Sequence, residues 1–439
     1  MTKNRQGSTH RGQSVPILDR LNALKAVRER VFAGSYEEAL ELTKTTKNPP
    51  AVIDYWRGIC LTGLGVEHAN EAKIWLKLAL GRGYAGAIGT LAVAERLLGE
   101  SREYLKELQP EDYANLDAFD RAALLREIGH AFEGDEELSI ATAYFEQAWN
   151  TAKLGLHAKI QLPFIGQMLG FSWHKRGYDA RALPILTEAL KFTSRTRRVD
   201  LLYRRCLVNL ELHNLEAVEL DLAEMKMFIP SNPELPPVVV YTQARLARAR
   251  GGDALPLALA LFQNAGELGH QAGTEVAFFS EFGAVSVQLE RGLVSTVLKN
   301  KLVYDTEIVE IGAEALMIGL QDLTNTPRLQ AFTWLREALV LAWTFEAHAP
   351  SVAVQALEAF RALHHRREEG WALLTLAETH LFLNQGEPNP EVLEAMNQAL
   401  EIAQELGAVV FVQELRLLPR VRAFLVDLEA DSSLRELLV

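Results

Sequence analysis

Basic side chains gather in the middle of the chain, at a spacing that suits the binding of an anion. Six lie between residues 191 and 205, and three follow between residues 245 and 250: Lys191, Arg195, Arg197, Arg198, Arg204, Arg205, Arg245, Arg248 and Arg250. If the segments that carry them stack side by side, these cations form one basic zone for an acidic peptide, a phosphate or a nucleic acid. The alternative is charge balance against nearby carboxylates, namely Glu211, Glu216, Glu219 and Asp221.

The eleven histidines offer a common metal ligand, but not the spacing that a metal site needs. No two of them form the i, i+4 pair that a helical zinc protease uses with its glutamate. His364 and His365 are adjacent, so on a helix they point about 100° apart and do not converge on one ion. Together with Arg366 and Arg367 they are expected to form a solvated helix end, where cations suit the helix dipole. The sequence therefore predicts no metal site.

The motifs of nucleotide binding and of nucleophilic catalysis are missing or misplaced. Residues 81–86 match the pattern G-x-G-x-x-G, but they follow helical sequence instead of a strand. We interpret them as a turn between helices that uses the conformational freedom of glycine. No Gly-x-x-x-x-Gly-Lys-Ser/Thr loop occurs, and no Ser or Cys sits in a nucleophile elbow. The sequence therefore predicts neither an enzyme nor a bound cofactor.

Apolar residues recur every three or four positions along most of the chain, which predicts a succession of amphipathic helices. Glycine turns and prolines separate them, because neither residue readily continues a helix. The predicted helices cover residues 15–31, 36–46, 52–64, 69–80, 84–98, 117–132, 137–154, 157–175, 180–192, 199–212, 215–228, 236–250, 255–268, 334–348, 352–363, 369–383, 390–406 and 409–428.

A small residue recurs in the second helix of each predicted pair and would let the two helices approach closely. We place one alanine at each crossing: Ala39, Ala72, Ala141, Ala182, Ala217, Ala258, Ala356 and Ala395. Their intervals lie close to a unit of about 34 to 45 residues or to multiples of it, which is typical of stacked helical hairpins. The pattern predicts an all-α fold.

Four segments follow from this repeat. Residues 1–14 are polar and basic and are expected to form a disordered tail. Residues 15–277 are predicted to be an N-terminal repeat array, and residues 346–439 to be C-terminal repeats that end in a capping helix. Between them the repeat fades, and β-branched side chains gather at residues 294–311. We therefore expect an irregular hairpin, and a hinge, over residues 278–345.

One unit carries the pattern of a known family in its clearest form. Leu169, Gly170 and Trp173, followed by Ala182, Leu186 and Ala189, fill six positions of that pattern. They resemble the tetratricopeptide repeat, and the resemblance extends with fewer matches over most of residues 18–425. It implies a right-handed α-solenoid, a superhelix built from tetratricopeptide-like hairpins.

Several second helices run past the usual end of such a repeat before a glycine interrupts them, as in Ala399-x-x-x-Ala403-x-x-x-Gly407. Units of this length resemble the regulatory domains of bacterial transcription regulators of the MalT and antibiotic-regulator type. In those families the repeats sense a small ligand or a protein, and other domains bind ATP and DNA. The resemblance implies a sensor without its output domain.

The resemblance also implies a binding surface, because the first helix of each hairpin lines the concave face of such an array. Counting back from the crossing alanines gives nine inward positions: Arg126, His130, Gln167, Phe171, His174, Tyr203, Asn209, Gln243 and Arg250. Amide, aromatic and cationic side chains at these positions suit an extended peptide or a helix. We expect them to line a groove that holds a partner.

Composition narrows the class of partner and compartment. Apolar residues make up 49% of the 439 residues and charged residues 23%, which is enough for a continuous core with a solvated surface. The net charge of −12 repels nucleic acid and anionic membranes, although a local basic patch stays compatible with it. No apolar run is long enough to span a bilayer. Cys60 and Cys206 lie in apolar helical sequence, so we expect buried thiols and a reducing cytoplasm.

These observations favour a non-catalytic binding or scaffold protein, a regulatory module that holds a protein or peptide in its groove. One alternative is a ligand-sensing regulator of transcription that acts through a partner. Another is nucleic-acid binding through the basic zone between Arg195 and Arg250. A homodimer is a further option, because apolar residues end the chain: Leu434, Leu437, Leu438 and Val439.

Overall fold

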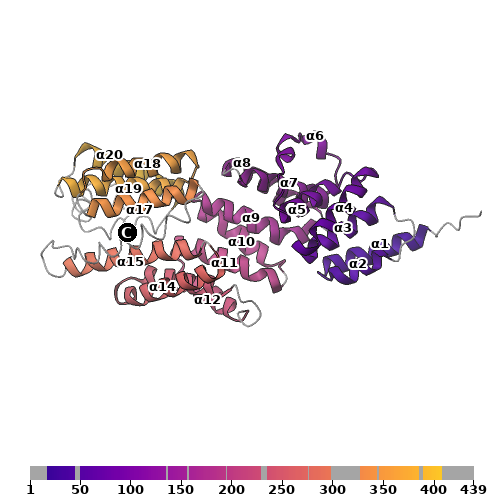
Figure 1. Cartoon of the computed structure of the whole chain (residues 1–439), viewed down its shortest axis with the longest axis horizontal. Helices are drawn as coiled ribbons and strands as arrows, with labels where there is room; N and C mark the ends of the chain where they lie inside the picture. The colour runs from indigo at the N-terminus through magenta and orange to yellow at the C-terminus, as the bar shows by residue number, and fades with distance from the viewer. Residues whose placement is uncertain are drawn as a thin grey trace, which may run out of the picture. The chain divides into compact units, whose positions relative to one another are not determined.

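A computed structural model describes most of the chain (Figure 1). The described residues are 17–44, 50–134, 137–155, 158–193, 195–228, 235–274, 276–297, 327–343, 346–384 and 389–407. Across these ranges the chain is almost wholly helical and contains no strand, which confirms the predicted all-α fold. The predicted tail at 1–14, the capping helix at 409–428, the apolar C-terminus and most of the segment 294–311 lie outside these residues.

The chain divides into two compact units. Unit 1 comprises residues 1–135 and 143–161, and unit 2 comprises residues 136–142 and 162–439. The four segments predicted from the repeat pattern stay a prediction.

In unit 1, consecutive helices pack against one another from α1 to α5, and α5 packs on α7. Their bounds are α1 Ile17–Phe32, α2 Tyr36–Lys44, α3 Ala51–Leu64, α4 Ala69–Gly81, α5 Ala87–Leu97, α6 Pro110–Tyr113 and α7 Ala118–Gly134. The next helix, α8 Leu138–Leu154, spans the boundary between the units. The G-x-G-x-x-G segment lies between α4 and α5, and Gly83 has φ +87° there. It is therefore the turn between helices that its context predicts.

Unit 2 continues as helical hairpins. The bounds are α9 Leu162–Lys175, α10 Asp179–Leu190, α11 Arg195–Glu211, α12 Leu215–Lys226, α13 Leu235–Arg250, α14 Leu255–Ala272, α15 Val276–Val297, α17 Pro327–Trp343, α18 Ala349–Ala362, α19 Arg366–Leu383 and α20 Pro390–Leu406. The first helices of three successive hairpins are neighbours, because α9 contacts α11 and α11 contacts α13.

Small residues set the close approach inside a hairpin, as the sequence predicts. A Cβ on Gly170 of α9 would lie 2.6 Å from the side chain of Leu186 on α10, so a larger residue would displace that leucine. Seven of the eight crossing alanines are buried: Ala39, Ala72, Ala141, Ala182, Ala258, Ala356 and Ala395. Ala217 is the exception, because it is only half-buried and Val218 beside it is fully buried. The predicted register of α12 is therefore wrong by one residue.

Three further expectations concern membranes, metals and thiols. Among the described helices, none is long and apolar enough to cross a bilayer. No group of three or more metal-ligating side chains occurs in the part of the chain that the structure covers. Cys60 and Cys206 are buried and unpaired, as predicted, and burial raises the pKa of the Cys60 thiol to about 12.

Candidate functional site

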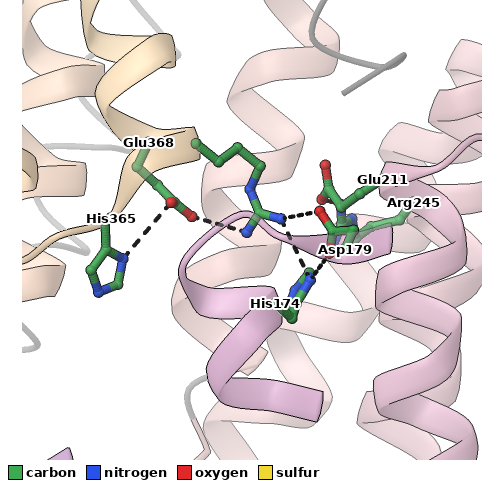
Figure 2. A network of polar contacts seen from close by, with 7 residues as sticks. His174, Asp179, Glu211, Arg245, His365 and Glu368 are labelled. Carbon is green, nitrogen blue, oxygen red and sulfur yellow. Dashed lines mark hydrogen bonds and ion pairs between the residues drawn. The ribbon is translucent and has the colours of Figure 1, made fainter. Parts of the chain in front are cut away.

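A buried network of charged side chains within unit 2 joins helices that are far apart in the sequence (Figure 2). Its centre is Arg367 in the first turn of α19, which is only 8% exposed. Nη1 of Arg367 donates to Oδ2 of Asp179 at 3.1 Å, and Nη2 donates to Oε1 of Glu368 at 3.0 Å. One guanidinium thus bridges two buried carboxylates, one of them 188 residues earlier in the chain.

The turn between α9 and α10 presents Asp179 to this guanidinium. Gly177 has φ +88°, a conformation that favours glycine, and it reverses the chain so that α10 begins beside the end of α9. Nδ1 of His174 lies 2.5 Å from Oδ1 of Asp179. Nη1 of Arg367 lies 3.4 Å from the same nitrogen, so His174 contacts both members of the ion pair. His174 therefore orients the carboxylate that binds Arg367.

A second ion pair lies beside the first. Nη2 of Arg245 on α13 donates to Oε1 of Glu211 at the end of α11, at 2.6 Å. Burial alone would raise the pKa of Glu211, but the guanidiniums of Arg367 and Arg245 lower it well below its usual range. Burial alone would lower the pKa of Arg367, but the carboxylates of Glu368, Glu211 and Asp179 raise this pKa above its usual range. Glu211, Arg245 and Arg367 therefore carry their full charge at neutral pH.

His365 and Glu368 form the other flank of the network, and Figure 2 shows both on a ribbon apart from the one that carries His174. Nδ1 of His365 lies 3.8 Å from Oε2 of Glu368, and neither atom makes a hydrogen bond within the described residues. Burial lowers the pKa of His365 to about 4, so the imidazole is neutral at pH 7. Fewer polar atoms are hydrogen-bonded on this flank of the network than on the Asp179 flank.

The expectation of a solvated cationic helix end at residues 364–367 is wrong. His364 is exposed, but His365 and Arg367 are buried. The segment lies at the N-terminus of α19, where the helix dipole opposes cations. Acidic side chains compensate, because Glu368 and Glu369 occupy the first turn. The sequence shows four adjacent basic residues, but nothing in it shows that distant carboxylates cover them.

Four of the predicted groove residues lie half-buried on the neighbouring helices α9, α11 and α13: Gln167, Phe171, Tyr203 and Gln243. Among them, Phe171 is surrounded by cationic and aromatic side chains. The guanidinium of Arg204 lies 3.8 Å from the centre of its ring and the Lys175 ammonium 4.8 Å away. The ring of His174 stacks beside it at 5.9 Å between centres. We call Phe171, Lys175 and Arg204 the cation–aromatic cluster.

The other predicted groove residues have partners within the protein. In unit 1, Arg126 is buried and donates to Glu127 and to Gln161, each at 2.9 Å. His130 lies 3.3 Å from Glu133 and meets the ring of Phe145 edge-on. In unit 2, Asn209 is buried and accepts from the Asn214 amide at 3.3 Å, while Arg250 pairs with Glu219.

Four of the seven described side chains of the predicted basic zone pair with carboxylates: Arg198, Arg205, Arg245 and Arg250. Arg205 forms a two-point contact with Asp221 at 2.5 and 2.9 Å, Arg198 contacts Glu224, and Arg245 contacts Glu211. Arg248 is half-buried on α13, and Lys191 is exposed. The side chains of Arg195 and Arg197 lie outside the described residues. Glu211, Glu219 and Asp221 are carboxylates that the charge-balance interpretation names.

Comparison with known proteins informs the fold alone. No family model and no curated protein matches the chain. A solved Rap protein complexed with competence and sporulation factor is similar at a TM-score of 0.56 and 11% identity, over 89% of this chain and 99% of that chain. The APC/C hetero-tetramer Cut9–Hcn1 also matches, with 11% identity over 92% of this chain and 95% of that chain, at a TM-score of 0.30. The similarity to the Rap protein supports a fold of repeated helical hairpins.

Proposed function

We propose that this chain is a non-catalytic binding protein that holds a protein or peptide partner on the first helices of its hairpins. The cation–aromatic cluster on α9 and α11 carries this proposal. Phe171 and Tyr203 pack on the core beneath them and stay half-exposed, so they offer a fixed apolar surface to a partner. Arg204 and Lys175 add positive charge at the same place. Aromatic and arginine side chains are the types that dominate binding energies at protein interfaces.

The chemistry of this surface favours a peptide or protein segment that carries both an apolar and an acidic side chain. The apolar side chain would lie against Phe171, and the carboxylate would pair with Arg204 or Lys175. Amides at Gln167 and Gln243 extend the same row of first helices and suit the backbone of an extended segment. The Rap protein of similar fold is itself in complex with a factor, which accords with this class of function.

Nucleic acid is a weaker alternative, because four cations of the basic zone pair with carboxylates of the chain itself. Arg198, Arg205 and Arg245 are each paired, and a paired cation releases few counterions when phosphate approaches. The net charge of −12 acts in the same direction.

A regulatory role in the bacterial cytoplasm, including control of transcription through the partner, extends the proposal. The buried free thiols of Cys60 and Cys206 fit a reducing compartment.

Capture of the partner with two charge-reversed variants tests the proposed surface. Arg204→Glu places a carboxylate over Phe171 on a first helix. Arg181→Glu is the matched control, because Arg181 lies 4.9 Å from the ring centre of Trp173 but on α10, a second helix. We expect wild type and Arg181→Glu to capture the same partner from an extract of the native organism, and Arg204→Glu to lose it at least tenfold. An equal catch from all three proteins would contradict the proposal.

A further inference from the structure

Two hairpins of unit 2 that are remote in the chain contact one another at the α9–α10 turn. A Cβ on Gly177 would lie 2.8 Å from Cβ of Arg367 and 2.9 Å from Cδ1 of Leu406, so this turn lies directly on α19 and on the end of α20. The hydroxyl of Tyr178 donates to Oε1 of Glu405 at 2.7 Å. The helices α11 to α18 lie between the two contacting hairpins in sequence.

The contact combines one apolar element with several charged ones. The Tyr178 ring packs on the core cluster formed by α17 to α20. Around it lie the ion pair of Arg367 with Asp179 and the pair of Arg366 with Glu405, whose Nε and Oε2 atoms are 2.9 Å apart. Charges therefore determine much of this contact.

We propose that Arg367 is a latch: its ion pair with Asp179 reversibly holds the α9–α10 turn against the α19–α20 hairpin. A permanent contact would be served at least as well by apolar side chains, because desolvation cancels much of the attraction in a buried ion pair. The unsatisfied atoms His365 Nδ1 and Glu368 Oε2 on the α19 side lower the gain on closing further. Both observations favour a contact that opens at a modest cost.

Opening the latch would change the surface beside the cation–aromatic cluster. His174 stacks on Phe171 and also holds Asp179, so release of Arg367 alters the neighbourhood of that ring. This consequence rests on the proposed function, whereas the latch itself does not require a partner.

The distance between the two hairpins measures the latch directly in the full chain without a partner. Nitroxide labels at Ala180→Cys on α10 and Glu401→Cys on α20 occupy exposed positions. The native thiols of Cys60 and Cys206 are buried and do not react with the label reagent. Double electron–electron resonance then gives the distribution of distances. We expect one short population to dominate in the wild-type background.

Arg367→Met removes the guanidinium and retains bulk. We expect the ratio of long to short distances to rise at least tenfold, because one partner of a buried pair is lost. Arg361→Met is the matched control. Its guanidinium contacts Glu369 and Gln398 within the α18–α20 group, so its loss should leave the short population in place. Circular dichroism must show equal helicity in both variants.

A wedge at Gly177 tests the same contact without removing a charge. Gly177→Ala inserts a methyl group against Arg367 and Leu406 at φ +88°. Gly83→Ala imposes the same backbone strain at φ +87° in unit 1, where a Cβ meets nothing within 4 Å. We expect the long-distance population only in the Gly177 variant. Unchanged distributions in both Arg367→Met and Gly177→Ala would overturn the latch.

Discussion

Asp120 of unit 1 shows how burial sets the chemistry of a single side chain. It is 4% exposed and accepts hydrogen bonds from the hydroxyls of Tyr55 and Tyr84, whose rings stack at 4.7 Å. Burial raises the pKa of Asp120 to about 6, although both hydroxyls favour the ionised form. Asp117 acts in the same direction as burial, and Arg28 opposes it.

This shift predicts a measurable effect of pH on stability. The folded protein binds a proton at Asp120 at a pH where the unfolded chain does not, so this group adds stability as pH falls from 7 to 5. The gain is about 1 kcal/mol, since each pKa unit corresponds to about 1.4 kcal/mol. In Asp120→Asn this contribution vanishes. Urea unfolding at both pH values should show the wild type gaining about 1 kcal/mol relative to the variant, and an equal response of both proteins would refute the assignment.

Some ion pairs are predictable from the sequence, and others are not. Asp221 follows Arg205 by 16 residues, which places both in one predicted hairpin, and the charge-balance interpretation includes that carboxylate. Asp179 and Arg367 lie 188 residues apart, and no periodicity relates them. A run of basic residues at a helix start has the same sequence pattern whether solvent or another hairpin surrounds it. Only the packing of remote hairpins distinguishes the two cases.

At the scale of elements, two glycines three residues apart on α14 make opposite demands. A Cβ on Gly269 would lie 2.5 Å from the backbone nitrogen of Ala277 on α15, and backbone cannot move aside cheaply. A Cβ on Gly266 meets only Cβ of Ser280 at 3.7 Å, an ordinary contact.

We therefore predict opposite signs for the same substitution. Gly266→Ala should stabilise unit 2 by about 0.5–1 kcal/mol, because alanine restricts the unfolded chain and suits a helix interior. Gly269→Ala should destabilise it by about 1–3 kcal/mol, since α14 and α15 must separate. Thermal unfolding of both variants decides the matter. If Gly269→Ala stabilised unit 2 as much as Gly266→Ala, the close approach at Gly269 would be absent.

The helices themselves were largely predictable, because period and turn residues act locally. The unit that contains Gly170, Ala182 and Ala189 follows from a pattern of small and large residues, and these three small residues are buried. The residue that packs at a hairpin crossing was less predictable than the helix that carries it. In α12 the alanine at 217 suggested the packing position, yet the larger Val218 fills it, because size alone does not fix which face meets the core.

At the scale of the whole molecule, stacked hairpins produce surface more readily than catalytic geometry. The first helices α9, α11 and α13 of unit 2 are neighbours, and each contributes half-exposed side chains to one row. The predicted groove residues divide accordingly. Gln167, Phe171, Tyr203 and Gln243 stay half-exposed on α9, α11 and α13, whereas Asn209 and Arg126 are buried in contacts of their own. Counting along a helix predicts a face, whereas the degree of burial depends on neighbouring helices.

Site-specific photo-cross-linking tests most directly whether the first helices hold the partner. A benzophenone amino acid would replace Gln167 on α9 or Gln243 on α13, and for comparison Leu220 on α12 or Leu257 on α14. The comparison sites are well exposed, at 72% and 57%, so poor access cannot explain a failure there. We predict that the first-helix sites cross-link to one common partner and that the second-helix sites do not. Cross-linking of that partner from Leu220 and Leu257, and none from Gln167 and Gln243, would contradict the account.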